Sequence, residues 1–128
     1  MLKKILVVDD SELIHNMFRI IFKRFKGSQQ IDAFNGVEAL KKLAEEDAIE
    51  LILLDINMPM MDGLTFLDIL KREKIYDKIP VIIVSTEGKE EDTIRGLQMG
   101  ARGYVKKPFK PPELYKLIEQ IFGAQAGA

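Results

Sequence analysis

The feature that most constrains the fold is a five-fold alternation of short, apolar runs with longer segments of helical period. Most of the short runs are rich in Val, Ile and Leu, as is typical of parallel strands that are covered on both faces. The alternation therefore predicts an α/β domain in which helices flank a parallel sheet. The expected strands are Lys4–Val8, Gln30–Phe34, Leu51–Leu54, Val81–Val84 and Gly103–Val105.

The segments between these runs predict five helices. Ser11 and Asp62 are expected N-caps, and Asn35 with Glu38 forms an expected capping box. One face of the first helix carries the apolar side chains Ile14, Met17, Phe18, Ile21, Phe22 and Phe25, and Gly27-Ser28 is expected to end it. The later helices are expected at Val37–Glu46, about Gly63–Glu73 and about Lys89–Met99, and the last starts at Pro111-Pro112.

The composition excludes several classes of protein. A chain of 128 residues has room for one domain. No apolar run approaches the roughly 18 residues that a membrane span needs, and no cysteine is present to form a disulfide or a thiolate metal site. The net charge of -1 offers no basic surface for nucleic acid. We therefore expect a cytoplasmic protein with no membrane insertion and no direct binding to nucleic acid.

Side chains that can carry chemistry follow four of the expected strands. Asp9 and Asp10 follow the first strand, Asp55 the third, Ser85 the fourth and Lys107 the fifth. In an open α/β sheet, ligands bind beyond the carboxyl ends of the strands. If the first and third strands are neighbours, about 4.8 Å apart, the three carboxylates lie within reach of one another. Such a cluster needs a counterion, and hard oxygen ligands suit Mg²⁺.

A carboxylate beside a divalent ion can attack phosphorus, so the cluster suggests an aspartyl phosphate at Asp55. Lys107 could neutralise the phosphoryl charge, and Ser85 could donate a hydrogen bond to it. Taken alone, however, Asp9 and Asp10 could equally be ordinary turn residues, because aspartate is common after strands.

Four motifs at these strand ends resemble the receiver domain of two-component response regulators. Because no output domain follows, the chain most resembles the stand-alone, chemotaxis-type members. The resemblance runs from Lys3 to Phe122 and implies a receiver domain over residues 1–123 with a flexible tail over residues 124–128. The motifs are Val7-Val8-Asp9-Asp10, the stretch LDINMPMMDG at residues 54–63, Val84-Ser85-Thr86 and the stretch GYVKKPF at residues 103–109.

The resemblance implies a flavodoxin-like (βα)5 fold, a three-layer sandwich around a five-stranded parallel sheet of strand order 2-1-3-4-5. It also implies that Asp55 is the phosphoacceptor, which receives its phosphoryl group from a sensor histidine kinase or a histidine phosphotransfer protein. Asp10 and Asp55 would bind Mg²⁺ directly, and Asp9 would hold it through water. Asn57 would contribute its backbone carbonyl to the same ion.

The resemblance further implies a switch in a phosphorelay. On phosphorylation, Ser85 would move toward the phosphoryl group and Tyr104 would turn inward. These movements would change the surface formed by the helix Lys89–Met99, the strand Gly103–Val105 and the last helix, which in this family binds a downstream effector protein. The protein would then be a monomer or a phosphorylation-dependent dimer.

The remaining implied roles concern the phosphoryl group itself. Lys107 would contact it, and the family's cis peptide would lie at Lys107-Pro108. Asn57, Thr86 and Glu87 occupy positions that would tune its lifetime. The resemblance thus implies a signalling protein, rather than an enzyme, that promotes its own phosphotransfer and dephosphorylation.

Three rival functions have their own sequence requirements. A phosphohydrolase of the haloacid dehalogenase type would need an aspartate two residues after the nucleophile, where Asn57 stands. A flavodoxin-like redox carrier would need a phosphate-binding loop after the first strand, where Asp9 and Asp10 would repel the cofactor. A degenerate receiver that works only as a scaffold would lack Asp55 or Lys107, and both are present.

A few other residues receive structural interpretations. The single histidine, His15, lies at the edge of the apolar face of the first helix, which favours a surface or boundary position over a phosphohistidine role. Lys106 is expected to face solvent. Tyr104 has an alternative interpretation as a half-buried strand aromatic. The stretch MPMMDG at residues 58–63 is expected to be a turn, and the methionines are expected to pack rather than bind metal.

Overall fold

The computed structural model describes residues 2–58, 60–74, 76–86 and 88–123, and the predicted tail lies outside them. Five strands form one parallel sheet in the order β2-β1-β3-β4-β5, which confirms the predicted fold class and strand order. The polar second strand, β2, lies at one edge of this sheet. The strands are β1 (Lys4–Val8), β2 (Gln29–Ala33), β3 (Leu51–Asp55), β4 (Val81–Ser85) and β5 (Gly103–Lys106).

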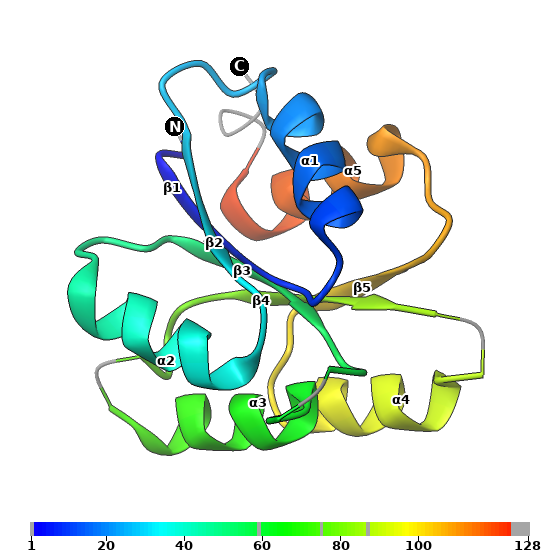
Figure 1. Cartoon of the computed structure of the whole chain (residues 1–128). Helices are drawn as coiled ribbons and strands as arrows, with labels where there is room; N and C mark the ends of the chain where they lie inside the picture. Colours follow the sequence, from blue (N-terminus) through cyan, green and yellow to red (C-terminus); the bar gives the residue numbers. More distant parts are fainter. Residues whose placement is uncertain (1, 59, 75, 87, 124–128) are drawn as a thin grey trace.

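Five helices in the described residues cover the two faces of the sheet. α1 and α5 lie on one face, and α2, α3 and α4 lie on the other, so the predicted three-layer arrangement is confirmed (Figure 1). The helices are α1 (Glu12–Phe22), α2 (Gly36–Glu45), α3 (Gly63–Arg72), α4 (Glu90–Gln98) and α5 (Pro111–Phe122).

The central strands are apolar throughout because each face of the sheet is buried in its own core. On β3, Ile52 and Leu54 belong to the core beneath α2 and α3, whereas Leu51 and Leu53 belong to the core shared with α1 and α5. All four side chains are at most 1% exposed. Alternate residues of one strand therefore stabilise opposite layers, as the pleat of a strand requires.

The predicted helix caps are largely confirmed. The side chains of Ser11 and Asp62 each accept a hydrogen bond from a backbone N–H in the first turn of their helices. Asn35 caps α2 in the same way, by accepting from the N–H of Glu38 at 2.8 Å. The carboxylate of Glu38 accepts from the N–H of Phe34 at 3.0 Å rather than from that of Asn35, so the capping box is displaced by one residue.

Several strand and helix boundaries differ from the prediction, most of them by a single residue. β3 and β4 extend to Asp55 and Ser85, so these polar residues are the last residues of their strands. α1 ends at Phe22, before Gly27-Ser28, and a turn in which the N–H of Phe25 donates to the carbonyl of Phe22 at 2.9 Å follows it. Phe25 remains buried, because this turn folds its ring back against the core.

Candidate functional site

The ends of β1, β3, β4 and β5 meet at one edge of the sheet. β1 and β3 are in register to their last paired residues, which places Asp9 beside Asp55. Asp55 pairs with the residue of β4 that precedes Ser85. The backbone N–H of Lys107 donates to the carbonyl of Ser85 at 2.6 Å. The topology therefore gathers the side chains that the sequence placed after separate strands.

Three carboxylates meet at this edge. Asp9, Asp10 and Asp55 each offer an oxygen, and these oxygens lie within 4.8 Å of one another. Two full charges at that separation repel by about 3.5 kcal/mol at an effective dielectric of about 20. Asp9 and Asp55 are buried, whereas Asp10 is exposed. The cluster is therefore electrostatically unfavourable by itself and favours a bound cation.

The Asp55 carboxyl responds most strongly to this environment. Burial raises its pKa to about 6, and the charges of Asp9 and Asp10 act in the same direction. The ammonium group of Lys107 and the N–H of Asn57, which donates to Asp55 Oδ1 at 3.3 Å, oppose the rise. Such a carboxylate is ionised at neutral pH but poorly compensated, and an electrophile or a cation would stabilise it.

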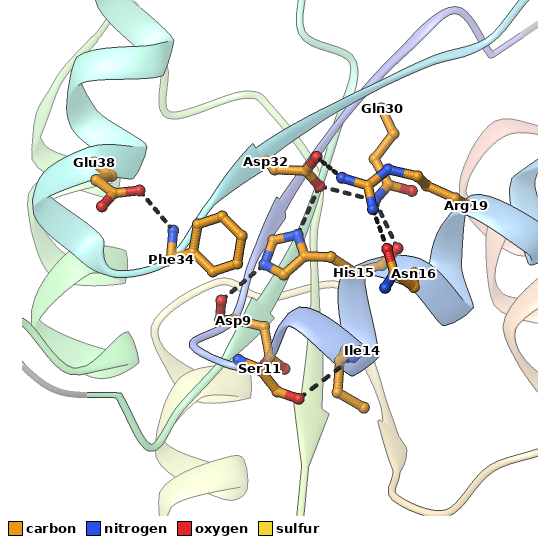
Figure 2. Close-up of polar contacts among 10 residues, drawn as sticks. All are labelled: Asp9, Ser11, Ile14, His15, Asn16, Arg19, Gln30, Asp32, Phe34 and Glu38. Carbon is orange, nitrogen blue, oxygen red and sulfur yellow. Dashed lines mark hydrogen bonds and ion pairs between the residues drawn. The ribbon is translucent and has the colours of Figure 1, made fainter.

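Asp9 is held at all of its polar atoms. Its Oδ2 accepts from Lys107 Nζ at 2.9 Å, and its Oδ1 accepts from the N–H of Ser11 at 2.9 Å. Its backbone N–H donates to the carbonyl of Ala33 at 3.1 Å, and its carbonyl oxygen lies 2.8 Å from His15 Nε2 (Figure 2). Lys107 thus binds Asp9 in this state of the protein.

The loop after Asp55 packs tightly against the strand end. The N–H of Gly63 donates to the carbonyl of Ile56 at 2.8 Å. A Cβ at Gly63 would lie 2.5 Å from the carbonyl oxygen of Asp55 and 2.6 Å from the Cα of Ile56. Only glycine fits here, because both of these neighbours are backbone atoms. Gly63 therefore supports the position of Asp55, a role that the expectation of a simple turn missed.

The donor set fits a hard divalent cation. Carboxylate oxygens within 4.8 Å of one another can share an ion whose oxygen ligands stand about 2.1 Å away, as they do around Mg²⁺. Asp10 and Asp55 contribute the carboxylates that the resemblance assigns to direct binding. Asp9 is engaged by Lys107, which suits an indirect contact through water. Asn57 lies in the exposed loop beside Asp55.

A cavity of about 280 Å³ lies beside the cluster, between β4, α4 and β5. Ser85 and Tyr104 line it from neighbouring strands, and Ile94 lines it from α4. Ser85 is buried, whereas Tyr104 is 50% exposed. The peptide bond Lys107–Pro108 is cis, as the resemblance implied. Glu87, expected to tune the phosphoryl lifetime, lies outside the described residues.

The position of His15 contradicts the prediction from the sequence. We expected a surface or boundary residue, but its side chain is fully buried. The ring packs 4.3 Å from that of Phe34, and both ring nitrogens face acceptors (Figure 2). The polar partner is Asp32, on the neighbouring edge strand β2. Helical periodicity placed His15 beside the apolar face, but it gave no indication of this partner.

Comparison with known proteins now assigns the chain to a family. The family model of the response regulator receiver domain matches residues 5–119. The chain belongs to the response regulator receiver family. As a receiver domain of two-component signalling, it is similar to the chemotaxis proteins of the CheY type, and its acidic cluster lies where receivers generally bind Mg²⁺.

Individual relatives support the assignment. The chemotaxis protein CheY homolog of Campylobacter jejuni is 34% identical over 97% of this chain and 95% of its own length. The phosphate regulon transcriptional regulatory protein PhoB of Klebsiella pneumoniae is 39% identical over 94% of this chain but only 52% of its own length. The structure of Vibrio cholerae chemotaxis protein CheY4 matches with a TM-score of 0.83 and 31% identity, covering 95% of this chain and 100% of that one.

This receiver has no helix, within the described ranges, that is long and apolar enough to cross a membrane. Lys106 is exposed and pairs with Glu90 at 3.3 Å, as expected for a solvent-facing residue. Residue 59 of the turn expected at residues 58–63 lies outside the described residues; of its neighbours, Met58 is buried and Met60 is exposed in a left-handed conformation.

Proposed function

We propose that this receiver is a phosphorylation-controlled binding switch in which Asp55 accepts a phosphoryl group from the phosphohistidine of a sensor histidine kinase or a histidine phosphotransfer protein. The observation that carries the proposal is the meeting of three carboxylates with the Lys107 ammonium group at one sheet edge. Membership of the receiver family supports it. The protein acts only on its own phosphorylation, so it is a signalling protein rather than an enzyme with a separate substrate.

In the proposed site, Asp10 and Asp55 would bind Mg²⁺ directly, Asp9 would hold it through water, and Asn57 would contribute its backbone carbonyl. When bound, the ion would neutralise charge shared between the carboxylates and the phosphoryl oxygens. The buried position of Asp55 keeps bulk water from competing for its oxygens.

Phosphotransfer begins with ionised Asp55, which is the dominant form at neutral pH because its pKa is about 6. One carboxylate oxygen forms a bond to phosphorus while the bond from phosphorus to the donor's imidazole nitrogen breaks, and that electron pair stays on the nitrogen. The Lys107 ammonium group, now 2.9 Å from Asp9, then turns to the new phosphoryl oxygens.

Dephosphorylation restores the carboxylate. A water oxygen attacks phosphorus, the bond from phosphorus to Asp55 breaks, and inorganic phosphate leaves with the protons of that water shared between phosphate and solvent. In the proposal, the access of this water to the phosphoryl group is controlled by the residues Asn57, Thr86 and Glu87. Asn57 and Thr86 are exposed and half-buried respectively, so they border the route from solvent.

The signal is carried by a change at the face formed by α4, β5 and α5. The Ser85 hydroxyl moves toward the phosphoryl group, and Tyr104 turns into the cavity of about 280 Å³ that both residues line. Half of the Tyr104 side chain is exposed before phosphorylation, so its movement removes an aromatic group from the surface. A downstream effector protein recognises the difference.

Incubation with Mg²⁺ and acetyl phosphate, followed by intact-mass spectrometry, tests the acceptor. We expect the mass of one phosphoryl group on the wild-type protein and none on Asp55→Asn. Beryllofluoride should shift the NMR signals of residues around Tyr104 in the wild type but not in Asp55→Asn. Lys107→Ala should be labelled yet show a weaker shift at Tyr104. Equal labelling of the wild type and Asp55→Asn would refute the assignment of the acceptor.

A further inference from the structure

We propose that His15 is a positioning residue for the metal site, because it holds the peptide group between Asp9 and Asp10 and thereby aims the Asp10 carboxylate at Asp55. The inference rests on the proposed function, since it concerns the Mg²⁺ site of that function. It gives a role to the one buried polar side chain of α1 that neither the sequence nor the family assignment explained.

The contact between His15 and Asp9 has a defined direction. His15 Nε2 lies 2.8 Å from the carbonyl oxygen of Asp9, and both groups are buried. A carbonyl oxygen can only accept, so Nε2 carries a hydrogen and donates it. A buried carbonyl left without a donor is costly, so this pairing is strongly preferred over an arrangement in which the Asp9 carbonyl has no partner.

Other residues fix the imidazole ring in this orientation. Nδ1 lies 2.6 Å from Asp32 Oδ1, which also accepts from Gln30 Nε2 at 2.9 Å (Figure 2). Arg19 pairs with the other oxygen of Asp32. The ring of Phe34 packs against the imidazole at 4.3 Å. A carboxylate that orients a histidine, which in turn orients a site, is a common arrangement around metal centres.

The charge on Asp32 is maintained by the same contacts. Burial disfavours its ionised form, but the hydrogen bonds from Gln30 and His15 and the charges of His15 and Arg19 outweigh burial and lower the pKa of Asp32. Asp32 therefore stays an acceptor at neutral pH. The chain of contacts runs from exposed Arg19 through Asp32 and His15 to the backbone of Asp9.

This chain of contacts matters because it bears on the direction in which the Asp10 side chain projects. The carboxylate of Asp9 is held by Ser11 and Lys107, whereas the Asp10 side chain is exposed and makes no hydrogen bond with any residue in the described ranges. The direction of Asp10 is therefore set by its backbone. The carbonyl that His15 holds belongs to the same planar peptide unit as the Asp10 nitrogen, so this bond fixes the plane from which Asp10 projects.

A purely structural role, in which His15 only ties α1 to β2, makes a different prediction. His15→Gln and His15→Met separate the two roles, because the side chains have similar length but only glutamine can donate to the Asp9 carbonyl. The Mg²⁺ dissociation constant is measured by NMR titration of the unphosphorylated protein, and stability is measured by urea unfolding in EDTA. Both measurements are repeated in an Asp32→Asn background, which avoids leaving the half-buried charge of Asp32 without the partner that His15 provides.

We expect His15→Met to weaken Mg²⁺ binding about tenfold, the lower end of the loss seen when a residue that orients a metal ligand is replaced, and we expect His15→Gln to retain the wild-type affinity. Asp32→Asn alone should bind Mg²⁺ like the wild type, because an asparagine amide can donate to Nδ1 and leave the hydrogen on Nε2. Equal affinity in the methionine and glutamine variants would overturn the inference, whether that affinity matches the wild type or is weaker by the same factor in both.

The proposed function fails in a distinguishable way. If the wild type binds no Mg²⁺, or binds it as well after Asp10→Asn as before, the metal site itself is wrong. If Asp10→Asn weakens binding but His15→Met does not, the metal site stands and only the role of His15 is wrong.

Discussion

Replacing Asp55 by asparagine should stabilise the metal-free protein, although it removes the proposed acceptor. Burial and the neighbouring aspartates raise the pKa of Asp55 from 3.8 to about 6. The folded state therefore disfavours the ionised carboxylate by up to about 3 kcal/mol, at about 1.4 kcal/mol for each unit of pKa. The penalty arises chiefly from burial of the carboxylate, and repulsion from Asp9 and Asp10 adds to it.

The pH dependence gives the sign of this effect. Below pH 3.8, the pKa of Asp55 in the unfolded state, the carboxyl is protonated in both the folded and the unfolded state and contributes nothing to the pH dependence of the free energy of unfolding. As the pH rises from 3.8 to about 6, the unfolded state loses its proton first, so the wild type loses stability. Above that range the loss is complete. The gain from Asp55→Asn should therefore grow from near zero at about pH 4 to as much as about 3 kcal/mol at about pH 8.

Urea unfolding in EDTA, followed by circular dichroism at both pH values, measures the gain. Asp68→Asn, which removes an exposed carboxylate paired with Arg72 on α3, controls for the loss of one negative charge and should change stability by less than about 1 kcal/mol. Saturating Mg²⁺ should stabilise the wild type more than Asp55→Asn. A gain from Asp55→Asn that is the same at both pH values, or a loss at about pH 8, would refute the reasoning.

Three further predictions concern the structure around the site. Gly63→Ala should cost at least about 2 kcal/mol in urea unfolding and slow labelling by acetyl phosphate, because its Cβ would meet the backbone carbonyl of Asp55 at 2.5 Å. Phe66→Ala, at a fully buried ring of α3, should cost about 3–5 kcal/mol and lower the urea midpoint accordingly. Asn35→Ala should cost about 1 kcal/mol by removing the cap that Glu38 N–H donates to, whereas Asn35→Asp should retain most of it in the same assay.

The order of elements and most of the site could be predicted from the sequence because both follow from local pattern. Strands buried on both faces must be apolar throughout, and in a parallel sheet their carboxyl ends share one edge. The sequence pattern therefore predicts that Asp9, Asp55 and Lys107 lie at the same edge of the sheet. The strand order 2-1-3-4-5 came from the family resemblance rather than from the residues, and the sheet confirms it.

Only the tertiary structure decided which side chains pair across the chain. Lys107 bonds to Asp9 across 98 positions of sequence, and His15 joins Asp32 on another element. Helical periodicity assigns a residue to a face of its helix, but it does not say which strand that face will meet. The predicted surface or boundary position of His15 is therefore wrong, because its side chain is fully buried.

The sequence by itself determined that this chain carries an acidic cluster at the edge of a parallel sheet, because strand burial and chain order are local properties. The tertiary structure decided how that cluster is held. It showed that Gly63 must lack a side chain and that the imidazole of His15 makes a hydrogen bond with the backbone carbonyl of Asp9. These contacts depend on distances between elements, which packing of the whole core fixes and no local pattern encodes.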